Sequence, residues 1–172
     1  MQHLTDFRSA DLAIGLGLMG RDYVYTTARL IDASLSSIYF TVFQSSYTPG
    51  RTSKPDLIVD ALVRAHQRGV TVNVLINFSG NQVIITNNKT LSYYLADRGV
   101  PVRFAGRGHL VHGKVIIIDG ETVIMGSHNL TQRGLWTNYE ASIAVYSPTI
   151  GSDMIRWFVD IWTRCKEVGS PG

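Results

Sequence analysis

The sequence has little of three features that would assign a small protein to a special class: cysteine, charge and long apolar runs. Cys165 is the only cysteine among 172 residues, so no disulfide can form within the chain and no zinc site can be built from thiolates. Charged residues make up 17% of the chain and hydrophobic residues 45%, which is typical of a globular protein and not of a disordered one. No apolar run reaches the ~20 residues of a membrane-spanning helix.

These shortages favour one compact domain in a reducing compartment. A chain of this length is expected to fold as a single domain over residues 1–172, with residues 1–20 as a peripheral N-terminal segment. That segment lacks the basic stretch that opens a signal peptide, so we expect a cytoplasmic protein without stable membrane attachment. The net charge of +3 fits a polyanionic partner such as nucleic acid or anionic lipid, and equally an ordinary soluble protein.

Helical and strand patterns alternate along the chain. Apolar residues at helical spacing predict helices over residues 21–35, 55–69, 89–99 and 149–166. Runs of β-branched and aromatic residues predict strands over residues 37–43, 71–77, 100–106 and 138–147. The segments 44–54 and 78–88 are expected to be irregular. This alternation predicts an α/β protein, with an α/β/α layered domain around a mixed β-sheet.

The stretch KVIIIDGETVIMG consists of two apolar runs around an Asp-Gly dipeptide, which is the strongest short-range signal for a β-hairpin. With the dipeptide as a two-residue turn, pairing outward places Lys114 opposite Met125 and His112 opposite Ser127. Residues that face each other across a hairpin, or lie two apart on one strand, share a face of the sheet. We therefore expect His112, Lys114 and Ser127 to meet on one face, joined by Asn129 if the chain stays extended.

Such a group of side chains suits the chemistry of a tetrahedral oxyanion. The imidazole of His112 is a nucleophile or general base near neutral pH, and the ammonium of Lys114 binds anions as a point charge. Ser127 and Asn129 add neutral hydrogen-bond donors. Phosphate is therefore the natural target. The alternative is a His and a Lys that merely extend into solvent from a strand end beside a polar turn.

The spacing of the whole stretch decides between these alternatives. It follows the pattern His-x-Lys-(x)4-Asp-(x)6-Gly-Ser-x-Asn, from His112 to Asn129, and a chance match at six fixed positions is on the order of one in a million. This pattern resembles the signature of the phospholipase D superfamily, the HKD phosphodiesterases. The resemblance extends over most of the chain, including the strand that contains Glu140, and it implies a phospholipase D-like fold.

The resemblance implies a homodimer, because members carry either two such motifs or one motif and a second copy of the chain. It also implies a two-step reaction, in which His112 of one copy forms a covalent phosphohistidine and His112 of the other protonates the leaving oxygen and then activates water. Lys114 and Asn129 would hold the non-bridging oxygens, and Ser127 would support the same pocket. Glu140 would orient the imidazole. No metal and no cofactor are needed.

Asp119 is interpreted differently from the rest of the motif. It lies at odd spacing from His112, so on a strand it points to the opposite face, and its place in the turn already explains an Asp. We interpret Asp119 as structural. A zinc site built from His109, His112 and His128 is disfavoured, because strand positions three apart also face opposite sides.

Short, single-motif members of the superfamily resemble nucleases, so the substrate is expected to be DNA or RNA. A nuclease needs a basic groove that follows the phosphate backbone. Arg107 and Arg133 flank the motif and are the best candidates for substrate binding. The other basic candidates are Arg51, Lys54, Lys89 and Arg103, and the candidate stacking partners are Tyr47, Phe78 and Trp136. Each has the alternative of an ordinary surface charge or a packed aromatic ring.

Two other functions remain open. A phospholipase D-type lipid phosphodiesterase is favoured by the apolar residues 83–85, which would dip into a bilayer surface, although stable attachment needs more than one such signal. A non-catalytic nucleic-acid-binding module with a decayed site is the third candidate. The intact motif residues argue against decay.

Overall fold

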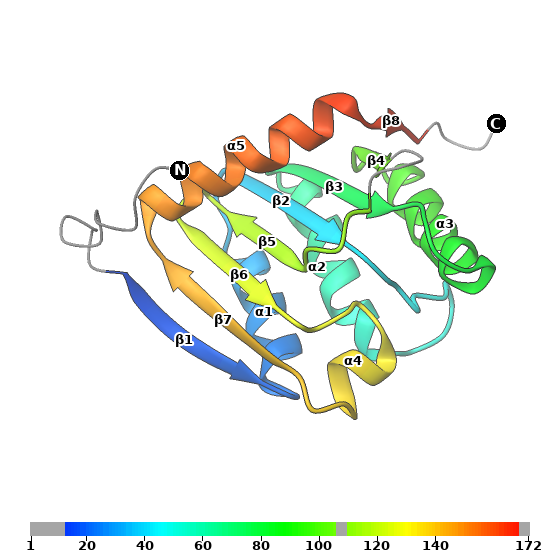
Figure 1. The fold of residues 1–172 in the computed structure, drawn as a ribbon, viewed down its shortest axis with the longest axis horizontal. Helices are drawn as coiled ribbons and strands as arrows, with labels where there is room; N and C mark the ends of the chain where they lie inside the picture. Colours follow the sequence, from blue (N-terminus) through cyan, green and yellow to red (C-terminus); the bar gives the residue numbers. More distant parts are fainter. Residues whose placement is uncertain (1–12, 106–109, 169–172) are drawn as a thin grey trace.

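The computed structural model of the protein describes residues 13–105 and 110–168. They form one mixed sheet of eight strands with helices on both faces, which confirms the predicted α/β/α arrangement (Figure 1). The elements, in chain order, are β1 (Ile14–Met19), α1 (Asp22–Asp32), β2 (Ser37–Val42), α2 (Lys54–Gln67), β3 (Thr71–Asn77), α3 (Gln82–Ala96), β4 (Val102–Ala105), β5 (Val115–Ile118), β6 (Thr122–Gly126), α4 (Gln132–Trp136), β7 (Ala141–Tyr146), α5 (Pro148–Arg164) and β8 (Lys166–Glu167).

The strands follow the order β1-β7-β6-β5-β2-β3-β4-β8 across the sheet. β2, β3 and β4 run parallel through the crossover helices α2 and α3, while the other neighbours pair antiparallel. Val115 at the start of β5 pairs with Thr41 near the end of β2. The beginning of the hairpin therefore lies at the carboxyl edge of the parallel strands, where open α/β sheets usually bind ligands.

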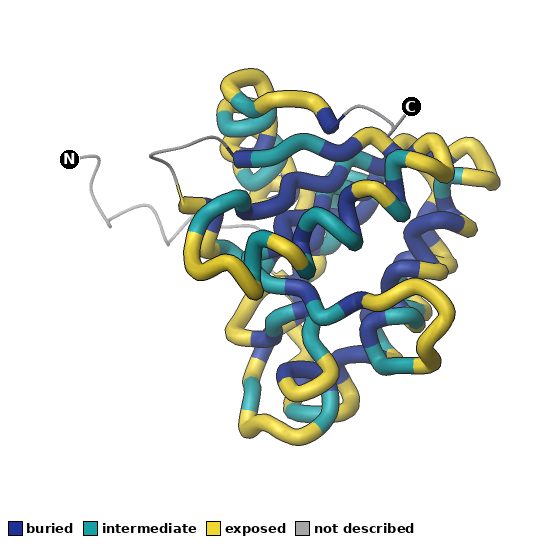
Figure 2. Tube along the Cα trace, turned by 90° about the vertical axis from the view of Figure 1, so that its right-hand side faces the viewer, coloured by how far each residue is buried: buried dark blue, intermediate teal, exposed yellow. Residues whose placement is uncertain are grey.

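Two apolar cores separate the three layers. On one face of the sheet, α1, α2 and α3 bury residues such as Ile31, Leu62 and Leu95 against the strands. On the other face, α5 buries Phe158 against Ile117 and its neighbours. Figure 2 shows the buried segments gathered between the layers and the exposed ones at the loops. Figure 1 shows that α5 crosses only part of its face and leaves much of β7 and β1 open.

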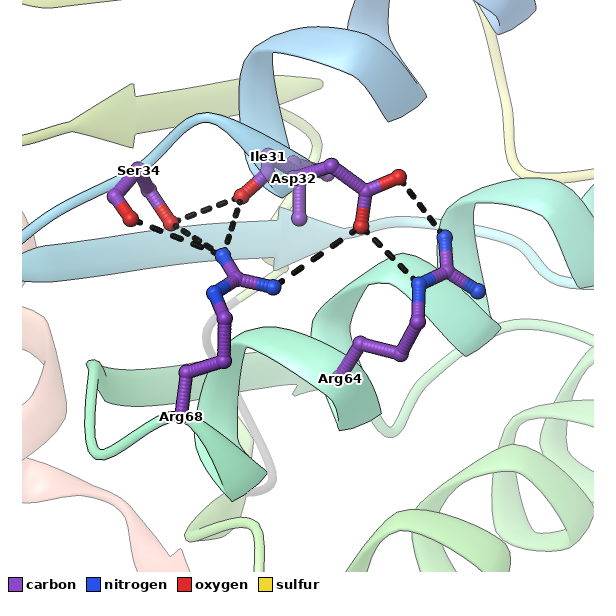
Figure 3. Close-up of polar contacts among 5 residues, drawn as sticks. All are labelled: Ile31, Asp32, Ser34, Arg64 and Arg68. Carbon is purple, nitrogen blue, oxygen red and sulfur yellow. Dashed lines mark hydrogen bonds and ion pairs between the residues drawn. The ribbon is translucent and has the colours of Figure 1, made fainter.

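The end of α1 is joined to α2 by charged side chains (Figure 3). Asp32 accepts hydrogen bonds from Nε and Nη2 of Arg64 at 3.0 and 2.8 Å. Nη2 of Arg68 donates to the carbonyl of Ile31 at 3.2 Å, and the same carbonyl also accepts from the N–H and the hydroxyl of Ser34. The exposed ion pairs of Asp32 contribute at most about 1 kcal/mol each, and they tie the end of α1 to α2.

A carboxylate from the hairpin holds the turn that follows α1. Asp119 accepts hydrogen bonds from the backbone N–H groups of Leu35, Ser36 and Ser37 at 2.9, 2.7 and 2.9 Å, and from the Ser36 hydroxyl at 3.0 Å. Burial by itself would raise the pKa of Asp119, but these four donors lower the pKa below its ordinary value. The side chain therefore ties the hairpin turn to the connection between α1 and β2.

The hairpin turns at the predicted dipeptide but contains a bulge. The N–H of Glu121 donates to the carbonyl of Ile118 at 3.1 Å, which closes the tight turn, yet Ile118 pairs with Thr122 in the ladder. Glu121 is thus one extra residue on its strand. Its carbonyl accepts a hydrogen bond from the N–H of Ser147 at 2.7 Å, so the bulged residue is bonded to the neighbouring segment instead.

The bulge makes the predicted register wrong by one residue. Met125 lies opposite Val115 and not opposite Lys114. The pairing predicted for His112 with Ser127 fails by the same shift. A shift of one residue exchanges the two faces of a strand. The turn therefore does not predict which of these side chains meet; their contacts in the structure show it.

We expected the segment 78–88 to be irregular, but α3 begins within it, at Gln82. Asn81 caps this helix by accepting a hydrogen bond from the N–H of Ile84 at 3.0 Å. In the expected peripheral segment, residues 14–19 form the edge strand β1, which pairs with β7. The short elements α4 and β8 were also not predicted.

Replacing Asp119 by Asn is expected to lower the free energy of unfolding by about 2 kcal/mol, because hydrogen bonds to a charged acceptor contribute about 1.5–3 kcal/mol. Asn tolerates the positive φ of 54° at this position, so the substitution tests the charge and not the turn. Urea unfolding measures the change. Asp97→Asn is the control, because the side chain of Asp97 makes only an exposed ion pair with Arg98 within the described residues. An equal loss in both variants would contradict the anchoring role.

Candidate active site

His112 and Lys114 lie together at the carboxyl edge of β2, just before β5. The Nζ of Lys114 donates to the backbone carbonyl of His112 at 2.8 Å and lies 3.3 and 3.4 Å from the two ring nitrogens. Phe43, which follows β2, packs edge-on against the imidazole at 4.5 Å, and Nζ lies 4.6 Å from the same phenyl ring. The phenyl ring therefore supports both members of the His-Lys pair.

The electrostatics of Lys114 suit a group that binds an anion. Burial lowers the pKa of Lys114, and the negative charge of Glu140 opposes that shift. The pKa nevertheless stays below its ordinary value. The ammonium is thus partly stripped of water before any substrate arrives, and a bound phosphate would stabilise its charge.

Ser127 and Glu140 form the second part of the site. The Ser127 hydroxyl donates to Oε2 of Glu140 and accepts from the N–H of Ala141 at 3.1 Å, while Asn138 donates to Oε1 of Glu140 at 3.0 Å. Burial would raise the pKa of Glu140, but these donors and the charge of Lys114 lower it below its ordinary value. The carboxylate is therefore held ionised at neutral pH.

Asn129 carries an unusual polar atom. Its side-chain Oδ1 is buried and has no hydrogen-bond partner within the described residues. A buried acceptor without a donor costs free energy, so few such atoms persist in native proteins. The carbonyl oxygen of the Asn129 amide is thus an unsatisfied acceptor within one described chain.

His128 is a site residue that the sequence did not reveal. Its ring is 2% exposed and stacks on Tyr23 with centroids 4.1 Å apart and an angle of 6°. Nε2 lies 3.1 Å from the carbonyl of Gly20, which only accepts, so Nε2 carries the proton. Nδ1 then accepts from the hydroxyl of Ser142 at 2.8 Å. His128 thereby fixes the backbone between Ser127 and Asn129.

The alternation of side chains along a strand was the one feature of the sequence that could have indicated the buried position of His128. Ser127 and Asn129 were expected on one face, so the residue between them had to face the other way, into the protein. The stacking partner and both hydrogen-bond partners come from distant parts of the chain, and no local pattern identifies them.

The remaining predicted residues are dispersed. Asp119 lies at the far end of β5 from His112, at the turn after α1. Arg107 falls outside the described residues. Arg133 is exposed on α4, and its side chain makes no hydrogen bond in the described part of the chain. Glu140 and His112 are not hydrogen-bonded to each other within one described chain.

The candidate stacking residues are mostly engaged already. Tyr47 is buried beside Tyr94, and Phe78 packs against Phe104. Trp136 lies under the charges of Arg21 and Lys54. The lining of the site is therefore made of polar and charged groups more than of free aromatic rings.

Within residues 13–105 and 110–168, no three His, Cys, Asp or Glu side chains lie close enough to hold a metal ion. No helix in the same ranges is both long and apolar enough to cross a membrane. His109 lies outside the described residues.

Comparison with known proteins identifies relatives. The model of a family described as "Cardiolipin synthase, PLD-like domain" matches residues 28–162. Cardiolipin synthase A of Pectobacterium carotovorum is 27% identical over 131 residues, which is 76% of this chain but only 27% of that protein.

Solved structures match over a larger share of their length. Nuc from Salmonella typhimurium, described as a phospholipase D family member, has a TM-score of 0.80 and 25% identity, over 92% of this chain and 100% of that chain. NucT from Helicobacter pylori shares the fold with a TM-score of 0.72 and 16% identity, over 91% of this chain and 100% of that chain.

His128 is expected to make the protein sensitive to acid below about pH 6.5. Burial lowers the pKa of His128 below its ordinary value of 6.5, and the bond to Gly20 offsets this only in part. The stability contributed by the neutral ring is therefore complete above pH 6.5 and is lost as the pH falls toward the lower pKa of the folded state. We expect the free energy of unfolding to fall less steeply between pH 6.5 and 5 in His128→Gln than in the wild type.

Chemical unfolding at several pH values measures both slopes. His66→Gln is the matched control, because His66 lies on α2 away from the site. Identical slopes in the wild type and His128→Gln would show that the ring does not titrate with folding.

Proposed function

The chain belongs to the phospholipase D superfamily, and on that premise we propose that it is a phosphodiesterase that cleaves nucleic acid at a site shared by two copies of the chain. The observation that carries the proposal is the grouping of His112 and Lys114 at the sheet edge, within the electrostatic reach of Glu140. An imidazole, an ammonium and an ionised carboxylate are the groups that phosphoryl transfer through a histidine needs.

The proposed reaction has two steps. The neutral ring of His112 in one copy attacks phosphorus, so that a P–N bond forms while the P–O bond to the leaving group breaks. His112 of the second copy donates its proton to the leaving oxygen and then takes a proton from water, whose oxygen displaces the first ring. Lys114 and Asn129 stabilise the charge on the non-bridging oxygens. The two rings titrate as a coupled pair, one neutral and one protonated.

Glu140 is assigned to the orientation of His112 across the interface between the copies. Within one chain, the oxygens of Glu140 are bonded to Ser127 and Asn138, and the ring of His112 faces Lys114. A histidine whose second nitrogen lacks an acceptor has no fixed tautomer. A second chain would supply that acceptor, which is one reason to expect the monomer to be inactive.

An uncovered apolar face supports the homodimer. Met19, Met125 and Ile143 share the face of the sheet that carries α5, and they are 61%, 37% and 42% exposed. Trp157 on α5 is 38% exposed and would touch a side chain placed at Gly113, between the motif's His and Lys. Apolar surface that adjoins half of a site is best covered by a second copy related by a two-fold axis.

Similarity over whole chains favours a nuclease over a lipid enzyme. The match to Nuc and NucT spans 100% of those chains, whereas this chain spans about a quarter of cardiolipin synthase A. The lipid phosphodiesterase is the second candidate, supported by the description of the matching family and by the exposed Val83 at the start of α3. A non-catalytic nucleic-acid-binding module is the third.

Replacing His112 by Ala is expected to reduce cleavage of nucleic acid at least about a thousandfold, because the covalent step is lost. The assay uses single-stranded DNA, duplex DNA, RNA and a phospholipid vesicle in EDTA, with His66→Ala as the matched control. Cleavage that persists in His112→Ala would refute the mechanism. Turnover of the phospholipid alone would establish the lipid function, and binding of nucleic acid without cleavage would establish the non-catalytic one.

Replacing Ile143 by Glu is expected to convert the dimer to monomers and to reduce activity at least about a hundredfold, because a charge on the covered face cannot be solvated in the dimer. Sedimentation velocity and the same cleavage assay measure the two effects. Val83→Glu is the control, because the side chain of Val83 is 66% exposed in the first turn of α3. A wild-type protein that is active as a monomer would contradict the shared site.

A further inference from the structure

A cavity with two cationic side chains lies beside the candidate active site. It has a volume of about 480 Å³ and is lined by Ser46, Thr48, residues 51–54, Leu57 and Gln132. Leu57 is the one aliphatic side chain among the residues that line it; the others are hydroxyl-bearing, amide or cationic. The cations of Arg51 and Lys54, together with the hydroxyl and amide groups of the lining, suit an anionic ligand.

Hydrogen bonds connect the wall of the cavity to the motif. The N–H of Ser46 donates to the carbonyl of Leu130 at 2.9 Å, and the N–H of Gln132 donates to the Ser46 hydroxyl at 2.8 Å. The N–H of Lys54 in turn donates to Oε1 of Gln132 at 2.7 Å. Gln132 follows Asn129 by three residues, so their Cα atoms are at most about 11 Å apart. The cavity and the reacting phosphate are thus close neighbours on one rigid frame.

The cations of the cavity are not neutralised by acids. The guanidinium of Arg51 is exposed and makes no hydrogen bond or ion pair in the described part of the chain. The Nζ of Lys54 lies 3.2 Å from the Tyr25 hydroxyl and 4.0 Å from the Trp136 ring centroid, which are both neutral. Arg21 lies over the same indole at 4.2 Å. Two positive groups, Lys54 and Arg21, therefore gather around one aromatic cluster, and Arg51 lines the same cavity as Lys54.

Several other surface arginines differ in this respect. Arg64, Arg156 and Arg164 each pair with an aspartate. The acid closest in sequence to the cavity is Asp56, and its two oxygens are already bonded to the N–H and the hydroxyl of Ser53. The cations beside the site thus keep their charge available for a ligand.

We propose that this cavity binds the phosphate that flanks the scissile phosphate on a polynucleotide strand, an inference that rests on the proposed nuclease function. Arg51 and Lys54 bind the phosphate oxygens, and the Nε2 of Gln132, which has no partner among the described residues, donates a further hydrogen bond. A strand that is held at two successive phosphates enters the reaction already aligned.

The arrangement favours recognition of the backbone over recognition of bases. The indole of Trp136 lies under two cations, so it positions them and is not free to stack on a base. A polynucleotide presents a second phosphate next to each scissile one, whereas a simple phosphodiester has none. Binding through phosphates carries no sequence information, so we expect cleavage with little sequence preference.

The test compares a polymeric and a minimal substrate. In the double variant Arg51→Gln, Lys54→Gln, we expect kcat/KM for a single-stranded oligonucleotide to fall about 10- to 100-fold, while hydrolysis of bis(p-nitrophenyl) phosphate is unchanged, because that diester has no flanking phosphate. The slope of log K against log salt should decrease by about 0.7, the value for one phosphate contact on a single strand. The matched control is Arg29→Gln, Arg98→Gln, which also removes two charges but lies outside the cavity.

A binding measurement distinguishes failure of the phosphate site from failure of the proposed nuclease function. Fluorescence anisotropy of a labelled oligonucleotide with His112→Ala, with and without the double substitution, measures the contact without catalysis. Arg51→Gln alone repeats the measurement with a side chain that makes no described contact, so loss of folding cannot explain its result. An affinity and salt slope equal to those of the control, or an equal loss on both substrates, would overturn the inference. A wild type that binds through this cavity but cleaves nothing would overturn only the nuclease function.

Discussion

The contact between Asp119 and the backbone of residues 35–37 is the constraint on which the rest of the site depends. Three N–H groups converge on one carboxylate, which fixes the hairpin turn against the beginning of β2. β5 then runs along β2 to its other end, where Thr41 accepts a hydrogen bond from the N–H of Val115 at 3.0 Å and donates to the carbonyl of Gly113 at 2.8 Å. Asp119 thereby helps to set the position of His112 and Lys114 at the other end of the strand.

Local patterns in the sequence predicted much of this fold. The Asp-Gly turn, the buried strands and the helices predicted over residues 55–69 and 149–166 follow from residue preferences that act over a few positions, and the structure confirms them. The bulge at Glu121 was not predictable in the same way, because its carbonyl is bonded to Ser147 on another segment. The prediction placed the start of α3 too late. The three aliphatic residues 83–85 were interpreted as part of an irregular segment, and Asn81 was not recognised as a helix cap.

The site shows the same division. The spacing of the motif identified its polar residues, but it gave no account of how the backbone between Ser127 and Asn129 is held. That support comes from His128, whose partners lie on α1, on β7 and in the turn after β1. The sequence offered Arg51 and Lys54 only as two among several basic candidates. The hydrogen bond between Gln132 and Ser46 is what brings their cavity close to the motif. Contacts between segments far apart in sequence are decided by the assembled sheet.

The stacked imidazole also bears on how far the chain can be shortened. The family match begins at residue 28, yet the carbonyl that accepts from His128 belongs to Gly20 and the ring beneath it belongs to Tyr23. A chain cut to the matched region would leave that imidazole with an unpaired N–H and an empty space beside it. The minimal unit that keeps the loop of Ser127 and Asn129 in place is therefore longer than the region that similarity alone would delimit.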